Sequence, residues 1–204
     1  MTDPESTSLA ASFRYATAGI LSTLVCQRNM KLHWIAAILV AYVASTLNFD
    51  LATRVVLLFC VGLVFFAELL NTAMEALVDL FTSEYHHAAR LTKDAMAGSV
   101  LVLATGTALV FATIIFNYLD TLPNLCPEIQ RTVALGVPHA AITAYLLFRR
   151  PTGFFNHFPF VITLVLALIQ VRFSTSHIFS GCLVALTVTP WATNLASTRR
   201  WLQA

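Results

Sequence analysis

The stretch AELLNTAMEALVDLF, Ala67–Phe81, sets polar side chains at regular intervals in an otherwise apolar run. Its acidic and amide members are Glu68, Asn71, Glu75 and Asp79, at spacings of three, four and four residues. Residues at these spacings lie on one face of an α-helix. Because a carboxylate near the end of a membrane span is costly unless it has a partner or a task, the row marks a candidate functional site.

The composition around this stretch is that of an integral membrane protein. Of the 204 residues, 58% are hydrophobic and 11% are charged, and the mean hydropathy is +0.76. A soluble domain has about 45–50% apolar and about 25% charged residues. The net charge of +2, without a basic run interleaved with aromatic residues, predicts no nucleic-acid partner. The four cysteines lack CxxC spacing and are expected to be buried thiols.

Apolar stretches predict an all-α protein that crosses the membrane about six times, given that one span needs roughly 20 residues. The segment 8–27 precedes them and is predicted to be an amphipathic helix on the membrane surface. The fifth stretch is short, which leaves its full crossing open. The stretches are approximately 34–49, 51–70, 95–118, 132–148, 158–171 and 178–192.

Basic residues predict the orientation of these spans. With six spans and a cytoplasmic N-terminus, nine Lys and Arg residues fall on the inner side, whereas Arg54, Arg131 and Arg172 fall on the outer side. This bias agrees with the positive-inside rule and places both termini in the cytoplasm. The polar N-terminal dozen, MTDPESTSLAAS, lacks the apolar core of a secretory signal. A proline-containing outer linker at 122–126 is expected to divide residues 1–121 from residues 127–204.

A second polar cluster follows the row in the predicted inner loop. Carboxylates bind Mg²⁺, Lys and His neutralise phosphate, and a further carboxylate accepts a proton from an attacking hydroxyl. This mixture predicts a phosphoryl-transfer site, and the absence of GxxxxGK[ST] excludes a P-loop. Solvated helix ends or structural ion pairs are the open alternative. The cluster comprises Glu84, Tyr85, His86, Arg90, Lys93 and Asp94.

The segment from about 12 to 118 resembles the prokaryotic diacylglycerol kinase and undecaprenol kinase family. The resemblance implies a three-span bundle with an N-terminal surface helix, usually a homotrimer, in the bacterial inner membrane. It also implies transfer of the ATP γ-phosphate to a membrane lipid hydroxyl with Mg²⁺. The forms NTAMEA and RNMKLH resemble the undecaprenol branch more closely. The matching motifs are FRYA (Phe13–Ala16), RNMKLH (Arg28–His33), ELLNTAMEALVD (Glu68–Asp79), SEYH (Ser83–His86), and Lys93–Asp94 followed by AGSVLV.

The same resemblance implies roles for individual residues. Glu68 matches the general base and Glu75 a metal-binding glutamate, while Asn71 and Asp79 match polar residues that support the site. Gln27 stands where the family often has the second metal-binding glutamate, so weaker metal binding, or more coordination by ATP phosphates, is expected. Nucleotide contacts are matched by Tyr15, Gln27, Glu75, Glu84, Tyr85, His86, Lys93 and Asp94, and lipid-substrate contacts by Asn29, Met30, Lys31, Leu32 and His33.

Residues 127–204 faintly resemble a type 2 phosphatidic acid phosphatase domain, through RRPTGFF (149–155) and RFSTSHIFSG (172–181). The His of that family's first motif is absent, and Gly181 stands where an acidic residue should orient His177. We therefore expect a degenerate region or a plain membrane extension. A phosphatase centred on His177 is the weaker alternative, and a catalytically weakened scaffold is the main rival to the kinase. His139 and His157 are expected to be core or interface residues.

Overall fold

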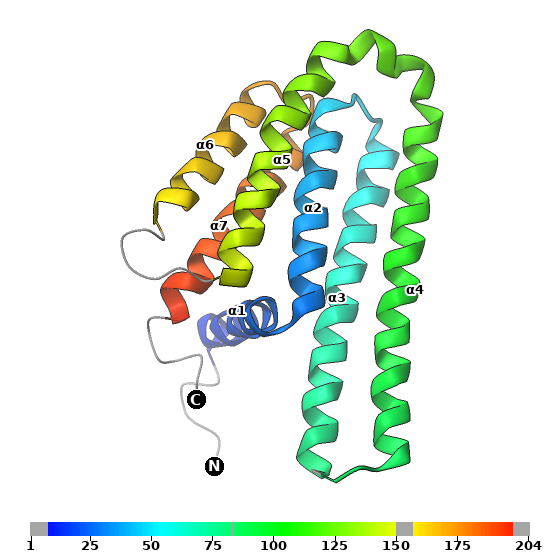
Figure 1. Ribbon diagram of the computed structural model, residues 1–204, viewed down its shortest axis with the longest axis vertical. Coiled ribbons are helices and arrows are strands. Elements are labelled where there is room, and N and C mark those ends of the chain that lie inside the picture. The colour runs from blue at the N-terminus through cyan, green and yellow to red at the C-terminus, as the bar shows by residue number, and fades with distance from the viewer. Residues whose placement is uncertain (1–7, 83, 150–156, 198–204) are drawn as a thin grey trace.

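The structure of the chain, a computed structural model, describes residues 8–82, 84–149 and 157–197. Within these ranges all regular elements are helices, which confirms the all-α prediction. Each predicted apolar stretch falls largely within one helix. In chain order the elements are α1 (Leu9–Cys26), α2 (Arg28–Thr46), α3 (Leu51–Phe81), α4 (His87–Asn117), the 3₁₀ helix η2 (Leu119–Leu125), α5 (Cys126–Arg149), α6 (His157–Arg172) and α7 (His177–Ser197) (Figure 1).

Helices α3 and α4 form a long antiparallel hairpin (Figure 1). Each has 31 residues, which at a rise of 1.5 Å per residue makes about 46 Å, against a hydrocarbon core of about 30 Å. The helices therefore continue beyond the apolar stretches that predicted them. Asp50 caps the start of α3, accepting from the backbone N–H of Thr53 at 2.9 Å. The polar residues of the row lie toward the opposite end of α3, near the hairpin turn.

The chain changes direction between α1 and α2 at one extended residue, Gln27. Figure 1 shows α1 lying across the ends of α2 and α7, while α2 stands alongside α3. This orientation fits the predicted surface helix, although α1 is long and apolar enough to cross a membrane. Ser8 caps its start, accepting from the Ala11 N–H at 3.1 Å.

Four segments meet the length and hydropathy expected of a membrane crossing: α1, α3, α4, and η2 with α5 taken together. The apolar helices α6 and α7 are shorter. Helix α2 begins with the polar sequence Arg28–His33, which lowers its hydropathy, yet it is the most buried helix of the fold. The protein is thus a multi-pass membrane protein in which α2 is covered by other helices.

The main core lies between α2 and the three helices of the C-terminal half. Helices α5, α6 and α7 surround α2, while the α3–α4 hairpin flanks it on another side (Figure 1). The core therefore joins residues on both sides of the predicted 122–126 boundary, which the structure forms as 3₁₀ helix η2 running into α5. Its buried members are Leu24, Met30, Trp34, Ile38, Ala41, Tyr42, Leu147, Ala167 and Leu183.

Buried polar contacts connect α2 to this half. The Tyr42 hydroxyl lies 3.0 Å from Nδ1 of His139 on α5, and Nε2 of His139 lies 3.3 Å from the Thr187 hydroxyl on α7. Gln170 on α6 donates through Nε2 to the hydroxyl of Ser45 at 2.9 Å. Because hydrocarbon offers no water to pair with such groups, each contact fixes its helices relative to one another. His139 is fully buried, which agrees with a core histidine.

Gly136 lets α5 approach the ring of Tyr42, since a Cβ built there would lie 3.1 Å from Cγ of that ring. We expect Gly136→Leu to lower the free energy of unfolding by about 1–3 kcal/mol, because the added side chain overpacks the α2–α5 contact. Thermal unfolding in detergent measures the effect. Gly181→Leu on α7 is the matched control, as nothing lies within 4 Å of a Cβ there. Equal stability of the two variants would contradict this account of the packing.

Candidate functional site

The row that marks the site lies along α3 and passes from buried to exposed. Glu68 is 1% exposed and Asn71 is 5% exposed, whereas Glu75 is half-buried and Asp79 is exposed near the hairpin turn. Asn71 donates through Nδ2 to Oε1 of Glu75 at 2.9 Å. The helical spacing thus produces a continuous polar face, as predicted from the sequence.

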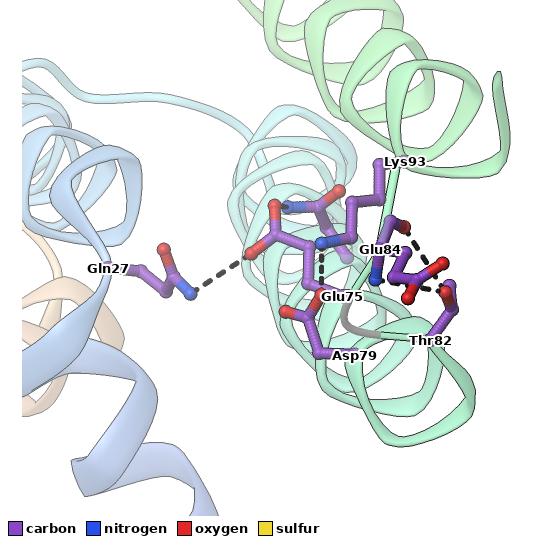
Figure 2. Close-up of polar contacts among 7 residues, drawn as sticks. Gln27, Glu75, Asp79, Thr82, Glu84 and Lys93 are labelled. Atoms are coloured by element: carbon purple, nitrogen blue, oxygen red, sulfur yellow. Dashed lines mark hydrogen bonds and ion pairs between the residues drawn. The ribbon is translucent and has the colours of Figure 1, made fainter. Parts of the chain in front are cut away.

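The corner between α1 and α2 supplies a residue from outside α3. Gln27 donates through Nε2 to Oε2 of Glu75 at 3.2 Å (Figure 2). The Glu75 carboxylate therefore accepts one amide N–H on each oxygen, from Asn71 and from Gln27. The structure brings together Gln27 and Glu75, the two residues predicted to bind metal. Within the described ranges, no three His, Cys, Asp or Glu side chains gather as a metal cluster.

Two buried oxygen atoms of the row have no hydrogen-bond partner among the described residues: Oε1 of Glu68 and Oδ1 of Asn71. Nε2 of His33 on α2 lies 3.3 Å from Glu68 Oε1 as an ion-pair contact. A buried acceptor left without a hydrogen bond costs about 1–3 kcal/mol. A ligand that brings a hydroxyl or a cation to these oxygens would offset this cost, which favours a binding site over a structural ion pair.

The second polar cluster lines a cavity of about 550 Å³ at the turn of the hairpin. Lys93 on α4 forms an ion pair with Asp79 on α3 (Figure 2), and Arg90 pairs with Asp94 at 3.5 Å. The cavity therefore combines cationic donors with carboxylates, as a polyphosphate with bound cations requires. Its lining comprises Val78, Asp79, Thr82, Glu84, Tyr85, His86, Ala89, Arg90, Lys93 and Asp94.

The segment matched to the lipid substrate divides between two environments. His33 faces Glu68, whereas Met30 and Lys31 are buried and Lys31 Nζ lies 5.3 Å from the ring centroid of Phe148 on α5. The remaining two members, Asn29 and Leu32, are exposed.

Tyr15, predicted to contact nucleotide, is exposed on α1 and does not line the cavity. Its hydroxyl accepts from Nη2 of its neighbour Arg14 at 3.4 Å. The cavity thus gathers five of the predicted nucleotide contacts, whereas Tyr15, Gln27 and Glu75 lie outside its lining. The five are Glu84, Tyr85, His86, Lys93 and Asp94.

Sequence reasoning missed an apolar crevice of about 240 Å³ between α2, α3 and α4. His33 lies on its wall, and Phe65 is three residues before Glu68 on α3. Small side chains on facing helices leave the space, and their helical spacing in the sequence was the available signal. The lining residues are His33, Ala36, Ala37, Val40, Val61, Val64, Phe65, Ala104, Thr107, Ala108 and Phe111.

Among the residues that the structure describes, the phosphatase-like positions of the C-terminal half do not converge; residues 150–155 of RRPTGFF lie outside them. Pro159, which stands where that family's first motif would be expected, lies in the first turn of α6, and Arg172 is the last residue of this helix, so the two regions are separated by its length. His177 is exposed at the start of α7. A nucleophile and its partners must lie together to work, so this arrangement favours the extension over a phosphatase.

These features define a multi-pass, all-α membrane protein whose helical hairpin carries a buried carboxylate, an apolar crevice and a polar cavity lined by cations and carboxylates. The family profile described as prokaryotic diacylglycerol kinase matches residues 14–116. The chain belongs to that family, which confirms the resemblance found in the sequence.

Curated relatives agree with this assignment. The chain is 39% identical over 104 residues to a diacylglycerol kinase of Synechocystis, which covers 50% of this chain and 59% of the relative. It is 35% identical over 99 residues to an undecaprenol kinase of Bacillus subtilis, covering 48% and 80%. It is 29% identical over 104 residues to a diacylglycerol kinase of Escherichia coli, covering 51% and 85%. No solved structure is significantly similar to the chain.

The ion pair between Lys93 and Asp79 contributes little to stability, since Asp79 is 65% exposed and Lys93 is 35% exposed. We expect Lys93→Met to change the free energy of unfolding by less than about 1 kcal/mol. Loss of the cation should nevertheless weaken tripolyphosphate binding about tenfold or more, as one charge-assisted contact is worth about 1.5–3 kcal/mol. Calorimetric titration and denaturation measure the two quantities. Unchanged tripolyphosphate affinity would exclude Lys93 from the anion site.

Proposed function

We propose that the protein is an ATP- and Mg²⁺-dependent kinase that phosphorylates a membrane lipid alcohol at the cytoplasmic face of the bacterial inner membrane. The observation that carries the proposal is the buried Glu68, whose Oε1 has no hydrogen-bond partner among the described residues. This atom lies 3.3 Å from His33, which lines the apolar crevice. The polar cavity lies further along the same hairpin, toward its turn. The relatives named as diacylglycerol and undecaprenol kinases support the same reaction class.

In this reaction Glu68 removes the proton of the lipid hydroxyl. The lipid alcohol approaches from the bilayer, and Oε1 of Glu68 accepts the proton as the hydroxyl oxygen attacks the γ-phosphate. Asn71 supports the site from one turn along α3, because its amide nitrogen donates to Glu75 and holds that carboxylate in place. Groups fixed in advance on one helix face need no reorganisation during the reaction.

The nucleotide lies in the cavity at the hairpin turn. Lys93 leaves its ion pair with Asp79 to contact phosphate oxygens, and Arg90 lies one turn away as a second cation. Tyr85 is 75% exposed and offers a ring for the base. With α3 supplying one wall and α4 the other, the phosphates point along the hairpin toward Glu75 and Glu68.

The site residues fit Mg²⁺ in donor type. Glu75 contributes a carboxylate, Asn71 an unpaired buried amide oxygen, and Gln27 an amide oxygen once its side-chain amide rotates by half a turn. Mg²⁺ often binds through one or two carboxylates together with substrate phosphates, and when bound it neutralises phosphate charge. Since Gln27 contributes no charge, ATP phosphates supply the larger share of the negative ligands.

The lipid chain occupies the crevice between α2, α3 and α4, with its hydroxyl at the His33 end. We favour undecaprenol as substrate, because the forms NTAMEA and RNMKLH resemble the undecaprenol branch more closely. The proposal includes the homotrimer implied by the resemblance, with both termini cytoplasmic.

Replacement of Glu68 by Gln tests the base directly. The amide keeps the shape of the side chain but does not accept the proton, so we expect kcat to fall at least about 100-fold. Transfer of labelled phosphate from ATP to undecaprenol, to short prenols and to diacylglycerol measures the reaction. Equal rates for Glu68→Gln and the wild-type protein would remove Glu68 from this role.

Replacement of Gln27 by Glu tests the metal site without an activity readout. Two carboxylates, at positions 27 and 75, would repel each other without a cation and would bind Mg²⁺ jointly. We expect Gln27→Glu to lower Tm in chelator and to raise it on Mg²⁺ addition, by more than wild type. An equal Mg²⁺ shift in both proteins would place the metal elsewhere.

A catalytically weakened scaffold is the second candidate, favoured by the neutral Gln27 and by the large C-terminal half. Nucleotide binding separates the two candidates. A kinase is stabilised by Mg-ATP in thermal unfolding, because a ligand that binds the folded state raises Tm. For a scaffold, we expect that Mg-ATP does not change Tm and that labelled ATP yields no labelled lipid from any prenol or from diacylglycerol.

A further inference from the structure

Helix α2 and the residue before it contribute to the candidate site. Gln27, the N-cap residue of α2, contacts Glu75, and His33 contacts Glu68. Trp34 stacks on Phe65 of α3 with ring centroids 5.1 Å apart. The position of α2 relative to α3 therefore decides whether both carboxylates meet their partners.

Helix α2 is also held by α7, through a backbone carbonyl of α7 that lacks its helical donor because of a proline. Pro190 has no N–H, so the carbonyl of Leu186, four residues earlier, loses its helical donor. Trp34 donates its indole Nε1–H to this carbonyl at 2.9 Å. In a membrane a released carbonyl needs such a partner. The sequence of α7 thus creates an acceptor that is matched to one residue of α2.

A second attachment lies two turns further along α2. The hydroxyl of Tyr42 contacts His139 of α5, which in turn contacts Thr187 of α7. Thr187 follows Leu186 directly, so both attachments end on the same turn of α7. Trp34 and Tyr42 are eight residues apart and therefore lie on nearly the same face of α2. Because the two contacts lie at different positions along α2, together they fix the tilt of this helix and its position along its own axis relative to α7.

The geometry points to helices α5–α7 as an internal positioning unit for the site, which sets α2 so that His33 and Gln27 meet Glu68 and Glu75. Trp34 and Tyr42 are its positioning residues, acting through α2 and not on the substrate. This inference rests on the proposed kinase function. It assigns a role to residues 127–197, which lie outside the region matched by the family profile.

The double variant Trp34→Phe with Tyr42→Phe tests the unit, since it removes both polar contacts and keeps an aromatic ring at each position. Lipid kinase kcat is expected to fall about tenfold or more, because small displacements of reacting groups are costly. KM for ATP should stay within about twofold, because no α2 residue lines the cavity. Trp191→Phe is the control: it removes an indole hydrogen bond of 3.2 Å to His157 that does not involve α2.

A second measurement does not depend on activity. Spin labels at Leu39 on α2 and Phe66 on α3, both exposed, report the distance between the helices in a protein without native cysteines. The double variant should broaden or shift this distance, and Trp191→Phe should not. An unchanged distance, or a kcat equal to that of the control, would overturn the positioning role. A wild-type protein that phosphorylates no lipid would instead overturn the proposed function, while the distance measurement still decides the positioning role.

Discussion

The fold depends on the requirement that polar groups inside a membrane find partners within the protein. Helix α2 satisfies this requirement on two sides at once. Toward the C-terminal half it pairs through Trp34, Tyr42 and Ser45, and toward α3 it meets the buried Glu68 through His33. A buried carboxylate is tolerated only beside such contacts or in the service of a reaction. The site therefore depends on packing far from the reacting atoms.

The α3–α4 hairpin is long enough to extend from a buried, apolar environment to a solvent-exposed one. Glu68 and the crevice lie where α3 is buried against α2, whereas Asp79 and Lys93 are partly exposed near the turn. A lipid alcohol and a nucleotide differ as much in solubility as these two environments do. In the proposed reaction, one continuous helix would carry both binding places at a fixed separation, since about 1.5 Å separates successive residues along its axis.

The sequence predicted the parts that periodicity and hydropathy control. The spacing of Glu68, Asn71, Glu75 and Asp79 fixes a shared helix face in any tertiary setting, and the structure has it. Hydropathy located the apolar stretches, and the spacing of the polar row predicted that the helix continues beyond the second stretch to about Phe81, where α3 ends. Hydropathy carried no information on which helices pack together, so the contact of Lys31 with Phe148 and the crevice beside His33 could not be predicted.

The single extended residue between α1 and α2 carries a mechanical consequence. Gln27 is the whole connection between the two helices, and its side chain contacts Glu75. Helix α1 lies across the ends of α2 and α7. Because one extended residue joins α1 to α2, a change in the angle between these helices would also move the amide that donates to Glu75.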